Sequence, residues 1–422
     1  MLRRISTRRL MLSIFVAVAA IAAVGAVTAF AVGNGPKPPA RSLANAVHDS
    51  LAGGPVAGIS ADVTFTDSLI ASTGGGSNSS GLPSGSPLLA GASGRLWISS
   101  DGELRLELQS GAGDTEILVS HDTVMLEDVA TNTVYEVTLP KRSSKSSSTS
   151  ASAGPTGPTA ASGDGVPSVS SIQTALTKLM GAVNVSAATP TDIGGAPAYT
   201  VTISPKHPAG LLGEAVLGWD AQHGIPLDVA IYASGDTTPV LELRATSVSF
   251  GAVAPSVFAI SPPRGARVVR ISPQGPPGTE STGSGTPPGH LVAASGMAAV
   301  GAALPFSLDA PSTLGGLRRD EVALLGWNGE RAAVARYGQG LASVAVIEFQ
   351  AAAYDQQGAA GGPAGAGAGL LGSLPHVSLG SVSASELPTA LGTVLEFTRA
   401  GVDYVVGGFV GPSAVEAVAR GL

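Results

Sequence analysis

Residues 95–139 have the sequence RLWISSDGELRLELQSGAGDTEILVSHDTVMLEDVATNTVYEVTL. Apolar and polar side chains alternate through this stretch, most clearly at residues 104–108 (LRLEL). A period of two is typical of a β-strand with one buried face and one face in water. Turn residues such as Asp101-Gly102 separate the alternating segments. The stretch therefore predicts a meander of antiparallel strands.

The same alternation recurs on both sides of this meander. Residues 59–65 place Ile, Ala, Val and Phe on one face, and residues 199–203 do the same with Tyr, Val and Ile. Residues 214–243 contain further hairpin patterns. Apolar residues at helical spacing predict short amphipathic helices over 43–51 and 172–179. We therefore expect a mainly β fold, in which one continuous antiparallel sheet carries packed helices.

The composition excludes several classes of protein and site. Charged residues are 13% of the chain, against roughly 25% in typical soluble proteins, so a long charged coiled coil is excluded. A formal net charge of −7 argues against nucleic acid as a partner, because phosphate binding needs a basic face. The chain has no Cys, which removes disulfides, thiolate zinc sites and lipidation on Cys. The Ala, Gly and Arg bias with scarce Lys indicates a GC-rich bacterial genome.

The N-terminus has the pattern of an export signal. Residues 1–9 contain four arginines, and the uncharged stretch 10–32 is long enough to cross a bilayer as a helix. We expect a transmembrane helix with a cytoplasmic N-terminus, which anchors the protein in the cell membrane as a single-pass protein with its bulk extracytoplasmic. The alternative is a signal peptide cleaved near Ala31, because Ala29-Phe30-Ala31 is a small-x-small pattern.

Segments rich in Gly, Ser, Thr, Pro or Ala divide the rest of the chain. They predict a first domain over 41–270 with disordered insertions at 71–87 and 141–168. A disordered linker at 272–289 leads to a small α+β domain over 296–422, which contains a flexible Gly/Ala loop at 358–369.

Five phrases in the first domain are similar to the lipoprotein-carrier superfamily, LolA/LolB-like, which includes the outer membrane lipoprotein-sorting proteins and the RseB-like regulators. They are Leu118-Val119-Ser120-His121-Asp122, Asn132-Thr133-Val134-Tyr135, Trp219-Asp220 with His223-Gly224-Ile225-Pro226-Leu227, Val248-Ser249-Phe250-Gly251, and Phe258 to Val268. Each phrase is degenerate, and the resemblance depends on their order and spacing.

The resemblance implies a half-open, curved antiparallel sheet whose concave face, with packed helices, encloses a lipid or lipoprotein acyl chain. The alternating strands then supply the ligand-lining candidates, which are Ile59, Val63, Phe65, Leu96, Leu104, Leu106, Tyr199, Val201, Leu227 and Val229. Periodicity does not separate this arrangement from a filled core, because the two differ only in volume.

The layout of a carrier-like domain followed by a smaller unit also resembles the RseB-like regulators. This resemblance implies the alternative function, in which the protein binds an anti-sigma factor or another envelope partner. A membrane-protein partner would then bind through residues 296–422.

We expect no enzyme activity, cofactor or metal site. The chain lacks G-x-S-x-G, G-x-x-x-x-G-K, G-x-G-x-x-G and H-E-x-x-H motifs. The pairs His48-Asp49 and His121-Asp122 could suggest a triad beside the many serines. Adjacent residues on a strand point to opposite faces, so a strand-end turn explains His121-Asp122 better.

Overall fold

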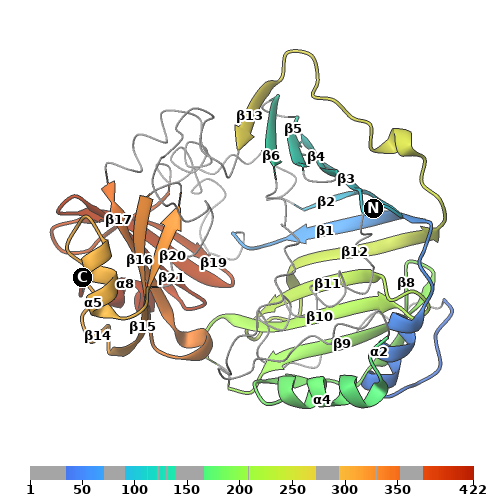
Figure 1. Ribbon diagram of the computed structural model, residues 1–422, viewed down its shortest axis with the longest axis horizontal. Helices are drawn as coiled ribbons and strands as arrows, with labels where there is room; N and C mark the ends of the chain where they lie inside the picture. Colours follow the sequence, from blue (N-terminus) through green and yellow to red (C-terminus); the bar gives the residue numbers. More distant parts are fainter. Residues whose placement is uncertain are drawn as a thin grey trace, which may run out of the picture.

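The computed structural model describes the chain from residue 35 onward, with gaps (Figure 1). The described residues are 35–70, 91–111, 113–120, 123–129, 132–138, 166–207, 209–271, 294–327, 330–351 and 374–422. Several sequence predictions lie outside them, namely the apolar stretch 10–32, the insertion 71–87, most of 141–168, the linker 272–289, the loop 358–369 and the pair His121-Asp122. No helix in the described part of the chain is long and apolar enough to span a membrane.

The first of two sheets contains thirteen strands of the described residues. Their order is β13-β6-β5-β4-β3-β2-β1-β12-β11-β10-β9-β7, and β8 pairs with β9. Their bounds are β1 Gly58–Asp67, β2 Ala92–Ser99, β3 Leu104–Ser110, β4 Gly113–Ser120, β5 Thr123–Asp128, β6 Thr133–Thr138, β7 Val183–Val185, β8 Thr189–Ile193, β9 Ala196–Pro205, β10 Leu212–Asp220, β11 Pro226–Ala233, β12 Pro239–Phe250 and β13 Arg267–Ile271. The strands turn from horizontal at β9–β12 to nearly vertical at β4–β6 in Figure 1, so the sheet is strongly curved. The predicted mainly β, curved sheet is confirmed.

Two helices of the predicted amphipathic type lie beside β9 in Figure 1. They are α2 (Leu43–Ala52) and α4 (Val169–Leu179). Ser42 caps α2, since its side chain accepts a hydrogen bond from the Asn45 N–H. Ser168 caps α4 in the same way through the Ser171 N–H. Residue 168 is therefore a helix cap, and the predicted disordered insertion 141–168 is too long at this end.

One strand of the first sheet departs from the expected antiparallel order. β13 pairs with β6 in parallel, with Arg267 opposite Thr133. After β12, residues 251–266 pass along one side of the sheet to its far edge, so the chain reaches β6 running in the same direction. A parallel pair requires such a crossover, which strand-by-strand periodicity does not reveal.

The second sheet contains eight strands of the described residues, in the order β14-β15-β16-β17-β21-β20-β19-β18. Their bounds are β14 Thr313–Leu314, β15 Leu317–Trp327, β16 Glu330–Tyr337, β17 Val344–Gln350, β18 His376–Ser378, β19 Ser383–Thr389, β20 Gly392–Arg399 and β21 Val402–Gly408. The helices α5 (Met297–Ala303) and α8 (Pro412–Ala419) cover one face, where Val300, Val415 and Val418 join the buried cluster of the sheet.

The sequence pattern predicts five of these eight strands, at residues 322–327, 331–337, 343–349, 394–398 and 402–410, and a C-terminal helix over 413–422. It missed β19, which contains Pro388 opposite Thr393 of β20. Proline lacks a backbone donor and so argues against a strand in a sequence pattern. β14 and β18 are too short to show any periodicity.

The two sheets touch through a small apolar cluster and two backbone hydrogen bonds. Leu69, Leu212 and Val240 of the first sheet pack with Leu341 and Leu391 of the second. The cluster lies where β1 ends and β10 begins. The hydrogen bonds join the Leu211 N–H to the Phe409 carbonyl at 2.6 Å and the Ala390 N–H to the Leu69 carbonyl at 2.8 Å.

Candidate functional site

Strand pairing places the predicted lining residues on one face of the first sheet, which we call the apolar face. Residues directly opposite one another on neighbouring strands share a face, as do residues two apart on a strand. The pairing series Val201, Leu217, Val229, Leu243 and Phe65 links β9 to β1. On the apolar face lie Ile59, Val63 and Phe65 of β1, Leu96 of β2, Leu104 and Leu106 of β3, Tyr199 and Val201 of β9, and Leu227 and Val229 of β11.

The β9–β11 part of the apolar face is packed core. Tyr199 and Val201 are buried with Trp219 beneath α2 and α4, and Val229 packs against this cluster. The indole Nε1 of Trp219 donates to the Ser50 hydroxyl at 2.8 Å, so α2 is bonded to the sheet. In this part of the sheet the apolar face is therefore a filled core, which is one of the two alternatives that the sequence left open.

The β1–β6 part of the apolar face is different, because two rows of apolar side chains cross six strands there. The first row is Ile59, Ile98, Leu104, Val119, Val124 and Val137, and the second is Ala61, Leu96, Leu106, Ile117, Leu126 and Tyr135. The two members on β1 are buried, whereas all ten on β2–β6 are only half-buried. Ile59 and Ala61 belong to a buried cluster with residues of β8, β11 and the β10–β11 turn, and Leu96, Ile98 and Leu106 pack against the edge of this cluster. The other seven side chains, on β3–β6, belong to no buried cluster of the described residues.

The opposite face of the same strands is closed. Leu118, Met125 and Val134 point to that side and are 6%, 6% and 0% exposed. Phe258 covers them, from the crossover segment that leads to β13. The difference between the two faces shows that the half-buried rows are not simply the result of lying near a sheet edge.

Sequence reasoning nominated only part of this surface. It nominated Leu96, Leu104 and Leu106 but missed six members on β4–β6, namely Ile117, Val119, Val124, Leu126, Tyr135 and Val137. The alternation in those strands was the available signal. Their faces could be assigned only once the cross-strand register was known.

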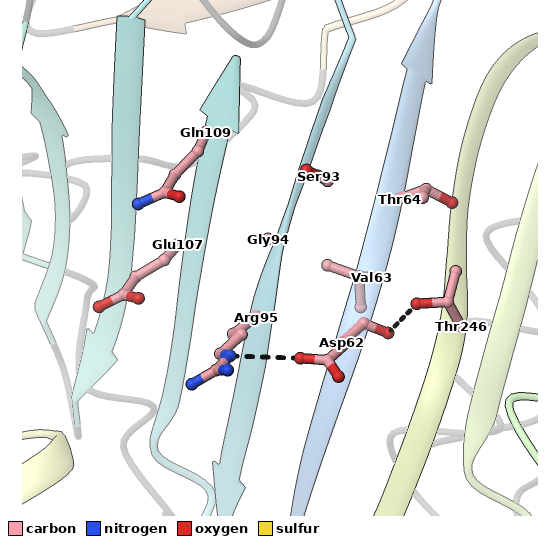
Figure 2. Close-up of a pocket in the computed structure, with 9 residues that line it drawn as sticks. All are labelled: Asp62, Val63, Thr64, Ser93, Gly94, Arg95, Glu107, Gln109 and Thr246. Carbon is pink, nitrogen blue, oxygen red and sulfur yellow. Dashed lines mark hydrogen bonds and ion pairs between the residues drawn. The ribbon is translucent and has the colours of Figure 1, made fainter.

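A polar cavity of about 440 Å³ lies on the other side of β1–β3, where β12 carries a β-bulge (Figure 2). Its charged members include Asp62 and Arg95, which form an ion pair at 3.2 Å, and the hydroxyl of Thr246 donates to the Asp62 carbonyl. Both charged side chains are more than half exposed, so the cavity is a shallow, wet groove. The described residues hold no group of three His, Cys, Asp or Glu that could bind a metal ion.

Two carboxyl groups elsewhere are strongly perturbed by burial. Asp228 is 1% exposed and ion-paired with Arg244, and burial raises its pKa to about 7 despite the arginine. In the second sheet, burial raises the pKa of Glu348 to about 7 although one oxygen accepts the Asp309 N–H at 2.9 Å. Both lie within the folded core.

The sequence pair His48-Asp49 does not form a catalytic arrangement. The Nδ1 atom of His48 lies 2.9 Å from the Pro167 carbonyl, and Asp49 pairs with Arg41 at 3.2 Å. The two side chains thus have separate structural partners.

No family model matches the chain, and no curated protein matches it. Among solved structures it is similar to the MucA/MucB complex of Pseudomonas aeruginosa, described as MucB bound to MucA(peri) in one case. The match has 14% identity and a TM-score of 0.38, over 89% of this chain and 95% of that chain. An uncharacterized conserved protein from Thermus thermophilus matches at 9% identity and TM-score 0.30, over 54% of this chain and 96% of that one. A putative outer membrane lipoprotein-sorting protein domain from Vibrio parahaemolyticus matches at 10% identity and TM-score 0.18, over 48% and 89% respectively.

Proposed function

We propose that this protein is a non-catalytic binding protein that holds an acyl chain of a lipid or lipoprotein on its apolar face. The chain would lie along the two half-buried rows of apolar side chains across β1–β6, which we call the open rows. The observation that carries the proposal is the pair of apolar rows across β1–β6, whose ten members on β2–β6 stay half-buried. Soluble proteins rarely leave a large contiguous apolar surface even partly exposed unless it binds something.

The dimensions of the rows suit an acyl chain. Six strands at about 4.8 Å spacing give a row of ~24 Å. One leaflet of a bilayer contributes about half of the ~30 Å hydrocarbon core, so a chain that fills a leaflet fits along the row. Both rows are aliphatic apart from Tyr135 and carry no charged side chain, which favours a hydrocarbon over a charged ligand.

The N-terminal pattern supports an extracytoplasmic location for this activity. Four arginines followed by the apolar stretch 10–32 favour a membrane anchor with the described residues outside the cell membrane. A tethered binding protein of this kind receives, transfers or senses lipid at the membrane surface.

A charge placed on the open rows tests the proposal. Leu106→Asp introduces a carboxylate that hydrocarbon cannot solvate, so the purified variant should lose co-purifying lipid. Gln109→Asp is the matched control, because it adds the same charge to an exposed position on the opposite face of the same strand. Circular dichroism establishes that both variants are folded. Lipid retention by folded Leu106→Asp would argue against this face as the binding surface.

A second candidate function is regulation of a membrane-protein partner through the second sheet. Two large apolar side chains there are unusually exposed, Val394 at 40% and Phe409 at 39%. Capture of a single-pass membrane protein by the wild-type chain, lost in Val394→Asp and accompanied by no lipid, would favour this function.

A further inference from the structure

The described chain begins at a fixed corner of the first sheet. A methyl group on Gly35 would lie 2.2 Å from the Asp192 carboxylate of β8, so the two residues are in close contact. The Tyr199 hydroxyl donates to the Pro39 carbonyl at 2.7 Å. Tyr199 lies opposite Trp219, the second-last residue of β10. Residues 35–39 are therefore held at the end of the first sheet where β10 finishes.

The tether between this corner and the apolar stretch 10–32 is short. Only three residue steps separate Val32 from Gly35, which span at most about 10 Å. Pro36, Pro38 and Pro39 follow and stiffen the chain up to its contact with Tyr199. If residues 10–32 lie in a bilayer, this corner cannot lie far from its surface.

The second sheet contacts the opposite end of the same strands. β10 starts at Leu212, which packs with Leu391 of the second sheet, and ends at Asp220 beside the tethered corner. Its nine residues span about 27 Å. β1 connects the same two ends in the opposite chain direction, because it starts at Gly58 and leads to Leu69 in the contact between the sheets.

Two cations at the corner suit an anionic membrane surface. Lys37 and Arg41 are both exposed, and Lys37 lies two residues from the described start of the chain. Arg41 pairs with Asp49 in an exposed contact, and such pairs contribute little. Juxtamembrane cations are attracted to anionic headgroups.

We infer that the end of the first sheet formed by residues 35–41 and the β10–β11 turn lies against the bilayer, while the second sheet is held away from it. This inference rests on the membrane anchor of the proposed function. It places any protein partner of the second sheet a strand length or more from the membrane surface, and it places the helix α2 beside the lipid.

Single-cysteine labelling tests the orientation, because the natural chain contains no Cys. The full chain is inserted in vesicles of phosphatidylcholine and phosphatidylglycerol and labelled with an environment-sensitive fluorophore at Lys37→Cys, Gln222→Cys or Val394→Cys. Gln222 is exposed in the β10–β11 turn, and Val394 is exposed on the second sheet. A headgroup-spin-labelled lipid then quenches labels near the bilayer surface.

We expect quenching several-fold stronger at positions 37 and 222 than at 394. A matched control inserts a Gly/Ser linker of about 20 residues between Val32 and Gly33, which should abolish the difference between 222 and 394 by freeing the corner. Equal quenching at 222 and 394 in the chain with its natural tether would overturn the inference while leaving the anchor intact. A full chain that does not sediment with the vesicles would overturn the anchor itself, and the inference with it.

Discussion

The two faces of the meander should respond differently to the same truncation. Leu118 is 6% exposed beneath Phe258, whereas Leu106 is half-buried in the open rows. Replacing a fully buried leucine with alanine costs about 2–5 kcal/mol, because both transfer energy and packing are lost. The Leu106 side chain buries less apolar area than that of Leu118, so Leu106→Ala should lower the free energy of unfolding by only roughly 1 kcal/mol. The expected difference in unfolding free energy is thus at least ~1 kcal/mol.

Urea unfolding of delipidated protein measures both costs. Because the two variants have the same chemistry and lie on adjacent strands, strand propensity largely cancels. Lipid should stabilise the wild type and the Leu118→Ala variant to a similar extent but Leu106→Ala less, since only Leu106 would contact the ligand. Equal costs for the two substitutions in the absence of lipid would show that the apolar face is as tightly filled as its opposite, and would refute the reasoning.

Three further substitutions test buried features of the fold. Burial raises the pKa of Glu348 from its ordinary value of 4.5 to about 7, so the folded state holds a proton that the unfolded state has already released. The free energy of unfolding should therefore fall by up to ~3 kcal/mol as the pH rises through this interval. Glu348→Gln should flatten this pH profile, which urea titrations at several pH values measure. Gly210 has φ +106°, and an added Cβ would lie 2.3 Å from the Phe409 backbone carbonyl at the contact between the sheets. Gly210→Ala should therefore speed amide exchange at this contact. Gly235→Ala is the control, because Gly235 is also strained, at φ +87°, but an added Cβ would meet no atom there. Arg244→Met leaves the carboxylate of Asp228 buried without its cation and should cost about 3 kcal/mol by thermal or urea unfolding, and a second change of Asp228 to Leu should recover much of it.

The elements that could be predicted from sequence are those whose pattern is complete within a few residues. The helix expected over 43–51 is α2, which begins at Leu43 after a Ser42 cap of a residue type that favours helix starts, and residues 104–108 lie in a strand with the expected alternation. A cap and a periodic face are local properties, so they are visible without knowledge of the fold. The parallel pairing of β13 with β6 was missed because it depends on a partner far away in the chain, and β19 was missed because its proline argues against a strand.

The candidate site was only partly predictable for the same reason. Leu106 and Tyr199 have the same alternating pattern in sequence, yet α2 and α4 cover Tyr199 and leave Leu106 half-buried. Leu106 and Leu118 likewise belong to neighbouring strands of one meander, but the crossover segment closes only the side to which Leu118 points. Coverage is decided by segments far away in the chain, and periodicity cannot report it.

Native mass spectrometry tests the central claim most directly. Residues 35–422 are purified from a lipid-containing host, and the intact mass is compared before and after organic extraction, with the extract analysed for lipids. The account predicts a stoichiometric adduct of lipid mass that extraction removes and that Leu106→Asp does not retain. A clean apo mass, with no uptake of added lipid, would contradict it and would favour a regulator that binds protein through its second sheet.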